Sequence, residues 1–81
     1  MRLPALNALV ECTWTDILGQ INSPLTECKP VQCVTVGRLA VKEKDHIVLV
    51  TSQYENDGET PVVDATAIPL GVIQSCRKIT L

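Results

Sequence analysis

The chain has 81 residues, of which 46% are hydrophobic and 20% are charged, and its formal net charge is −2. This length fits one small domain over residues 1–81, and the charge argues against a bulk electrostatic attraction to nucleic acid. The sequence has no run of about 18 apolar residues, which excludes a transmembrane helix. Disordered chains are poor in apolar residues, so disorder is not expected either.

The residue types favour β-strands. Valine, isoleucine and threonine together supply 24 residues, and these branched side chains are enriched in strands. Trp14 and Tyr54 are the only aromatic residues. Trp14 is expected to anchor the core or a subunit contact, whereas Tyr54, beside an acidic loop, is expected to be the more exposed ring.

The first predicted strand covers residues 9–15. Val10, Cys12 and Trp14 alternate there with polar residues, which is typical of a half-buried strand. Residues 16–30 contain glycine, asparagine and proline and are predicted to form a loop. One short helical turn is expected to begin at Asp16, whose carboxylate would cap it.

The second predicted strand, 31–42, contains a change of phase. Val34 and Val36 share one face, but the next apolar pair, Leu39 and Val41, has the opposite parity. A glycine at such a change predicts a β-bulge or sharp bend, and Gly37 occupies it. Strong bends of this kind close small sheets into barrels.

Three further strands complete the predicted fold. A polar turn at 43–45 leads into a strand at 46–53, so that 31–42 and 46–53 form a hairpin. A polar loop follows at 54–61. The last two strands, 62–68 and 72–79, are joined by a tight connection at 69–71. Five short strands of this spacing predict an all-β fold, a small, strongly bent barrel of the SH3 or OB size. Any strand left at an edge can pair between subunits.

So small a core can be stabilised by disulfides, by a metal site or by oligomerisation, and the cysteines bear on the first two. Four cysteines would suggest two disulfides in a secreted domain, but the N-terminal residues make a poor signal peptide, so an intracellular protein with reduced thiols is expected. The Cys28–Cys33 spacing is a weak zinc half-site, and buried free thiols acting as small hydrophobic groups are favoured. Oligomerisation is then the expected stabilising device. The four residues are Cys12, Cys28, Cys33 and Cys76.

Catalytic signatures are not recognisable in the sequence. The single histidine, His46, lies beside a predicted turn, where a surface role is the usual one. The acidic residues fall at turns and strand ends, and neither a phosphate-binding loop nor a dinucleotide fingerprint occurs. We therefore expect no enzyme activity, no cofactor and no metal site.

Basic residues occur in and near the predicted strands. The favoured interpretation is that these residues lie on solvent-exposed faces of the strands. The alternative is that they form a basic rim where several subunits meet in a ring. The five residues are Arg38, Lys42, Lys44, Arg77 and Lys78.

Several segments resemble an Sm-like module. Residues 34–39, the turn at 43–45 and residues 47–50 resemble its first half, and residues 68–75 resemble its closing half. With residues 12–16, the whole pattern over 9–79 is similar to small Sm-like proteins of phage and cyanophage. The resemblance implies a bent five-stranded barrel and a homo-oligomeric ring of five to seven subunits joined by edge strands.

Sm rings commonly bind single-stranded RNA at their inner rim. The sequence departs from that pattern at two places: no asparagine follows Asp45 in the first turn, and residues 69–71 replace the Arg-Gly or Lys-Gly feature of the later turn. The expected locality is the cytoplasm of an infected host cell, or a virion, with no membrane association.

The leading hypothesis is a non-enzymatic, ring-forming Sm-like phage protein that binds nucleic acid or a nucleotide at the pore or at subunit junctions. One alternative is a structural, assembly or protein-interaction component of a phage. Another is a sponge that sequesters a host immune signalling nucleotide. The candidate ligand-binding residues are Arg38, Lys42, Lys44, His46 and Tyr54, with Arg77 and Lys78 as a secondary basic patch.

Overall fold

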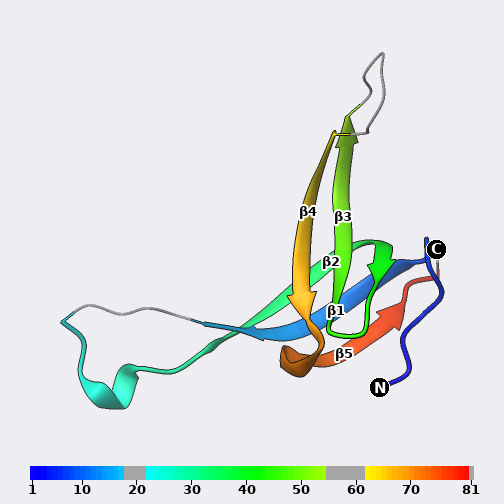
Figure 1. The fold of residues 1–81 in the computed structure, drawn as a ribbon. Helices are drawn as coiled ribbons and strands as arrows, with labels where there is room; N and C mark the ends of the chain where they lie inside the picture. The colour runs from blue at the N-terminus through cyan, green and yellow to red at the C-terminus, as the bar shows by residue number, and fades with distance from the viewer. Residues whose placement is uncertain (18–21, 55–61, 81) are drawn as a thin grey trace.

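The computed structural model describes residues 1–17, 22–54 and 62–80. They form one antiparallel sheet of five strands in the order β4-β3-β2-β1-β5, with two short 3-10 helices (Figure 1). All five predicted strands are confirmed, and each observed end lies within one residue of the predicted end. Their bounds are β1 Leu9–Asp16, β2 Val31–Lys42, β3 His46–Tyr54, β4 Val62–Pro69 and β5 Ile73–Lys78, and the 3-10 helices are η1 Leu25–Glu27 and η2 Leu70–Val72.

The long strand β2 changes partner along its length. It pairs with β1 from Val31 to Arg38 and with β3 from Arg38 to Lys42. The β3–β4 hairpin therefore rises away from the sheet as one arm, and the β1–β2 hairpin extends sideways as another (Figure 1). The all-β prediction is confirmed, but the sheet is open, because β4 and β5 lie at its opposite edges and are not paired.

The irregularity of β2 does not lie at Gly37, where the sequence placed it. Pairing with β1 is regular past Gly37, and the register shift with β3 falls between Leu39 and Val41. Gly37 and Leu39 face the core, so Val34 lies on the opposite, outer face. Gly37 is required for another reason: a β-carbon there would lie 2.7 Å from the carbonyl oxygen of Val50.

The core lies inside the bend of the sheet, and every strand contributes to it. Cys12 and Leu39 are fully buried, and Trp14 is half-buried against them. The indole Nε1 of Trp14 donates a 3.0 Å hydrogen bond to the Thr35 hydroxyl. The predicted core role of Trp14 is thus confirmed. The buried cluster consists of Val10, Cys12, Leu39, Ile47, Leu49, Ile68 and Ile73.

The connections agree in part with the sequence. Asp16 is the last residue of β1, and its carboxylate accepts a 2.8 Å hydrogen bond from the Ile17 backbone N–H. The helical turn expected to begin there falls partly on residues 18–21, which lie outside the described residues; the turn that is described is η1. The tight connection before β5 is formed by η2. Most of the predicted loop at 54–61 also lies outside the described residues.

The molecule is extended for its size. Its radius of gyration is 15.2 Å and its axes span 50 × 30 × 27 Å, whereas about 12 Å is usual for a compact chain of this length. The accessible surface is 6107 Å², against about 4800 Å² for a folded monomer of this mass. An excess of about 1300 Å² is therefore left uncovered. No helix among the described residues is long and apolar enough to cross a membrane.

Candidate functional site

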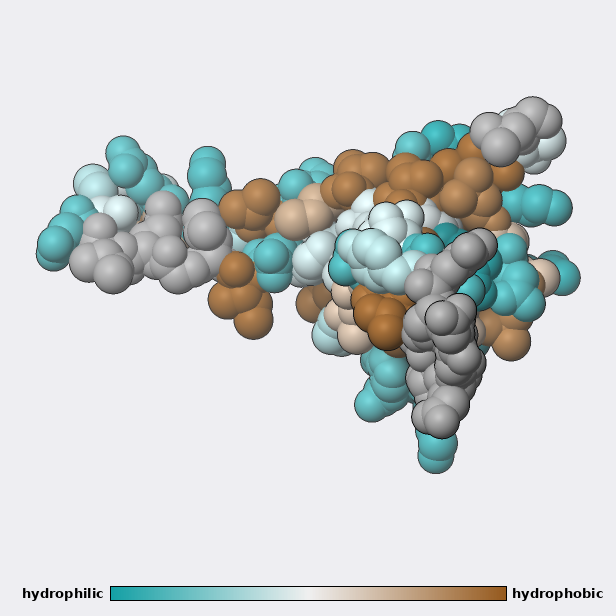
Figure 2. All heavy atoms as spheres, turned by 90° about the horizontal axis from the view of Figure 1, so that it is seen from above, coloured by the Kyte–Doolittle hydropathy of each residue, from teal (hydrophilic) through white to brown (hydrophobic). Residues whose placement is uncertain are grey.

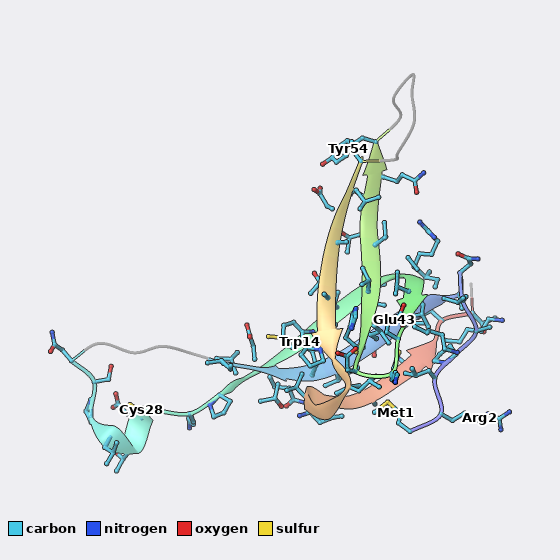
Figure 3. The ribbon with its side chains drawn as sticks, viewed as in Figure 1. Met1, Arg2, Trp14, Cys28, Glu43 and Tyr54 are labelled. Carbon is cyan, nitrogen blue, oxygen red and sulfur yellow. The ribbon has the colours of Figure 1, made fainter. Side chains whose placement is uncertain are left out.

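The five candidate ligand-binding residues do not come together at one place. Lys42, Lys44 and His46 lie at the turn between β2 and β3. Tyr54 lies at the other end of β3, about 26 Å from His46 along an extended strand. Arg38 lies in the middle of β2, where the two arms separate. Figure 3 shows Tyr54 at the top of the β3–β4 arm and Glu43, of the hairpin turn, near its base.

The hairpin turn forms an open depression with mixed charge. Its lining includes Glu43, Lys44, Asp45 and His46, with the apolar side chains of two flanking valines. The His46 Nδ1 lies 2.7 Å from the Asp45 carboxylate, and this hydrogen bond lowers the pKa of Asp45 below its ordinary value. Two carboxylates thus face one lysine and one histidine, an arrangement that does not concentrate positive charge for a polyanion.

Arg38 and Lys42 hold the N-terminal segment against the sheet. The Arg38 guanidinium donates to the Asn7 side-chain oxygen at 3.1 Å and to the Gln53 side-chain oxygen at 3.2 Å. The Lys42 ammonium donates to the Pro4 carbonyl at 2.9 Å. Both cations therefore have structural partners in the described part of the chain.

Tyr54 and Asp64 are joined across the β3–β4 arm. The Tyr54 hydroxyl donates a 2.5 Å hydrogen bond to the Asp64 carboxylate, and this bond raises the pKa of Tyr54. The ring is 51% exposed, as the sequence predicted. It is the outward-facing aromatic group of this arm and is separate from the charged turn.

The secondary basic patch lies on the edge strand β5. The Arg77 guanidinium forms a 3.0 Å ion pair with Glu11 of β1, and its Nε donates to the same carboxylate at 3.1 Å. Lys78 is the next residue and lies opposite Val10 in the register. Arg77 and Lys78 are both exposed, at the end of β5 that is nearest the chain terminus.

The cysteines are unpaired, and burial distinguishes them. Cys12 and Cys76 lie directly opposite each other on β1 and β5. Burial, reinforced by the neighbouring Cys76, raises the pKa of Cys12 to about 11. Cys33 is half-buried and Cys28 is exposed, so the expectation of buried thiols is right for Cys12 and wrong for Cys28. Among the described residues, no three potential metal-ligand side chains gather at one place.

The exposed apolar side chains of the two arms were not anticipated from the sequence. On the β1–β2 arm, Val34 is 61% exposed and Val36 is 46% exposed. Figure 2 shows apolar atoms on the surface of that arm and along one long side of the molecule. The sequence shows that the valines at 34 and 36 share one face of the strand, but it does not show which face of the strand is covered by the core. The exposed large apolar residues are Met1, Leu6, Ile17, Leu25, Val31, Val34, Val36, Tyr54, Val62 and Val63.

The exposed valines of β2 and β4 lie on strands that have a free edge. β4 and β5 are the outer strands of the sheet, and among the described residues the first half of β2 has a strand partner on one side only. Free backbone N–H and C=O groups next to exposed apolar surface are suited to strand addition by another chain. Comparisons of this sequence and structure with protein-family models, curated proteins and solved structures give no match.

Proposed function

We propose that this protein is a non-enzymatic assembly module that joins copies of itself by pairing strand β4 of one copy with strand β5 of the next. The observation that carries this proposal is the open, extended sheet, whose accessible surface of 6107 Å² is about 1300 Å² larger than that of a compact chain. A standard interface removes about 800 Å² from each partner. The excess therefore amounts to between one and two such interfaces on each copy.

Charge complementarity supports this particular pairing. An antiparallel arrangement of β4 beside a neighbour's β5 brings the start of β4 near the end of β5. Asp64 lies near the start of β4, and Arg77 and Lys78 lie at the end of β5. Opposite charges would thus meet across the junction, whereas pairing β5 with another β5 would bring cations into the same sheet.

Repetition of this contact builds a closed assembly. The two pairing surfaces differ, so each copy offers one to the neighbour on either side, and such head-to-tail contacts close into a ring when the rotation permits. The Sm-like resemblance suggests five to seven copies. This proposal favours the structural and assembly alternative over the nucleic-acid hypothesis, because the candidate cations are dispersed and two of them bind the chain itself.

The test is the molar mass by light scattering at micromolar concentration. The wild-type chain should have a mass several times that of one copy. D64K should lower this mass, and combining D64K with R77E and K78E should restore it, because the charges are then exchanged across the junction. E27K, on exposed η1, is the matched control and should leave the mass unchanged. A monomeric wild-type chain would contradict the proposal.

Ligand binding at the hairpin turn is a second candidate. Lys44 and His46 line the same open depression as Glu43 and Asp45, so a phosphate there would meet an ammonium and an imidazole beside two carboxylates. The experiment measures binding of a labelled oligouridine and of a nucleotide panel at low salt. Binding that is lost in K44A and H46A but kept in K29A would support this function; the absence of binding across the panel would remove it.

A further inference from the structure

We propose that the free edge of β2, residues 31–36, is a second self-association surface that pairs with the same edge of a second copy about a two-fold axis. This inference goes beyond the proposed β4–β5 contact, because it uses another edge of the sheet and a different symmetry. The β2 edge is defined here as the side of residues 31–36 that faces away from β1.

The β2 edge has no strand partner in the described part of the chain. β3 pairs with β2 only from Arg38 to Lys42 and then leaves as an arm. The backbone groups of residues 31–36 that point away from β1 are therefore open to another strand. Natural proteins usually protect such an edge with a lysine, a proline or a bulge. Residues 31–36 read Val-Gln-Cys-Val-Thr-Val and contain no charged residue and no proline.

The side chains at the β2 edge are apolar and exposed. Val34 and Val36 lie on the outer face with 61% and 46% of their surfaces exposed, and Val31 is 42% exposed. The outer strands differ in this respect, because Asp64 and Arg77 place charges on β4 and β5. The β2 edge is therefore the one of these three on which two identical copies meet without bringing like charges together.

The fold limits the register of this pairing. Gly37 lies against the Val50 carbonyl, so an added strand cannot run past residue 36 without meeting β3. Antiparallel pairing about an axis perpendicular to the sheet keeps the outer faces of both copies on one side. With the axis at Val34, that residue lies opposite its own counterpart, and Val36 lies opposite Gln32 of the second copy. The three strands β5, β1 and β2 of each copy then form one sheet of six.

A second copy is the occupant best matched to this edge. The contact is self-complementary, as a two-fold interface requires. The exposed surfaces of Val31, Val34 and Val36 lie along this edge, and the same edge of a second copy would cover them with apolar side chains of its own. A charged or phosphorylated partner would find no complementary group among residues 31–36.

The first experiment places a charge at the centre of the proposed contact. V34K puts two lysines opposite each other and should raise the dissociation constant of this contact at least about 100-fold, measured by sedimentation. T13K is the matched control. Thr13 is the cross-strand neighbour of Val34 on the same outer face, one strand away from the edge. Equal masses for wild type and V34K would overturn the proposal.

A second experiment needs no charge and keeps the edge apolar. In a background with Cys28 and Cys33 replaced by serine, V34C should form a disulfide-linked dimer under mild oxidation, because the two β-carbons of a directly opposite pair lie within reach of a disulfide. T13C in the same background should stay monomeric on a non-reducing gel. Equal or absent cross-linking in V34C and T13C would overturn the two-fold pairing even if V34K failed to fold.

The experiments distinguish the β4–β5 contact from the β2 contact. A wild-type mass of two copies that D64K leaves unchanged, together with V34C cross-linking, supports the β2 contact alone. Retained assembly in V34K, with no V34C cross-link, supports the β4–β5 contact alone. If both contacts exist, the wild-type mass should be twice that of V34K.

Discussion

Gly37 and the backbone of Val50 are in direct contact: a β-carbon on residue 37 would lie 2.7 Å from the Val50 carbonyl oxygen and 3.2 Å from the carbonyl carbon. β2 changes partner from β1 to β3 at the next residue, Arg38, so the absence of a side chain at residue 37 lets the backbone of β3 approach there. The contact fixes where the two arms diverge and therefore how much of β2 is left as a free edge.

Gly37→Ala should destabilise the fold by about 1–3 kcal/mol, because the obstructing atoms belong to the backbone of β3 and cannot turn aside as a side chain would. Urea unfolding followed by circular dichroism measures this effect. Gly71→Ala is the control: a β-carbon there meets nothing within 4 Å, and the change should stay within about 0.5 kcal/mol. Equal stabilities for the two variants would show that β3 is not held against Gly37.

The hydrogen bond between Trp14 and Thr35 should be measurable as a coupling free energy. Trp14→Phe and Thr35→Val each remove the 3.0 Å bond from the indole Nε1. A double-mutant cycle on the free energy of unfolding should give about 0.5–1.5 kcal/mol. The same cycle with Thr13→Val should give a value near zero, since Thr13 lies on the outer face. Equal coupling in both cycles would contradict the described orientation of the indole.

Stability should fall as the pH rises from about 9 to 11, and Cys12 should account for part of that fall. Its pKa is raised to about 11 by burial in the folded chain, whereas an unfolded cysteine loses its proton near 8.5. In this window the unfolded state binds fewer protons, so increasing pH favours unfolding. Cys12→Ala should show a shallower decrease than wild type in urea unfolding at pH 8 and 10.5. The control Cys28→Ala, at an exposed cysteine, should lose stability with pH as steeply as wild type. If Cys12→Ala also loses stability as steeply as wild type, Cys12 is not a cause of the decrease.

Tyr54 should titrate above its ordinary value, and Asp64 should be the cause. The 2.5 Å hydrogen bond to the carboxylate favours the protonated phenol and raises its pKa. Tyr54 is the only tyrosine, so near-ultraviolet absorbance follows this one group. Asp64→Ala should move the midpoint to lower pH, whereas Asp45→Ala, at the far end of β3, should not. An unchanged midpoint in Asp64→Ala would mean that the bond is not made in solution.

The local features of the fold follow from the sequence. The alternation of Val10, Cys12 and Trp14 with polar residues predicts β1 and its buried face, and the valine-rich runs predict the other strands. These patterns depend on neighbouring residues and on the two-residue period of a strand. The resulting bounds agree with the structure to within one residue. The role of Trp14 follows as well, since a core without phenylalanine has few large side chains to use.

The relations between strands were decided by the tertiary structure. The sequence shows that Val34 and Val36 share a face, but only the packing of Leu39 into the core leaves that face uncovered. The separation of Tyr54 from His46, in contrast, follows from the strand predicted over 46–53, because an extended strand places its first and last residues far apart.

The composition of the chain thus determined an aliphatic, strand-forming domain with little charge. Whether its apolar residues close one barrel or remain at open edges depends on contacts between residues far apart in the chain. Three features of the tertiary structure leave the edges open. They are the close backbone approach at Gly37, the register shift after Leu39 and the separation of β4 from β5. The change of phase around Gly37 is a local signal of an irregularity, but the residues that each contact joins have none, because they depend on where a distant strand comes to lie.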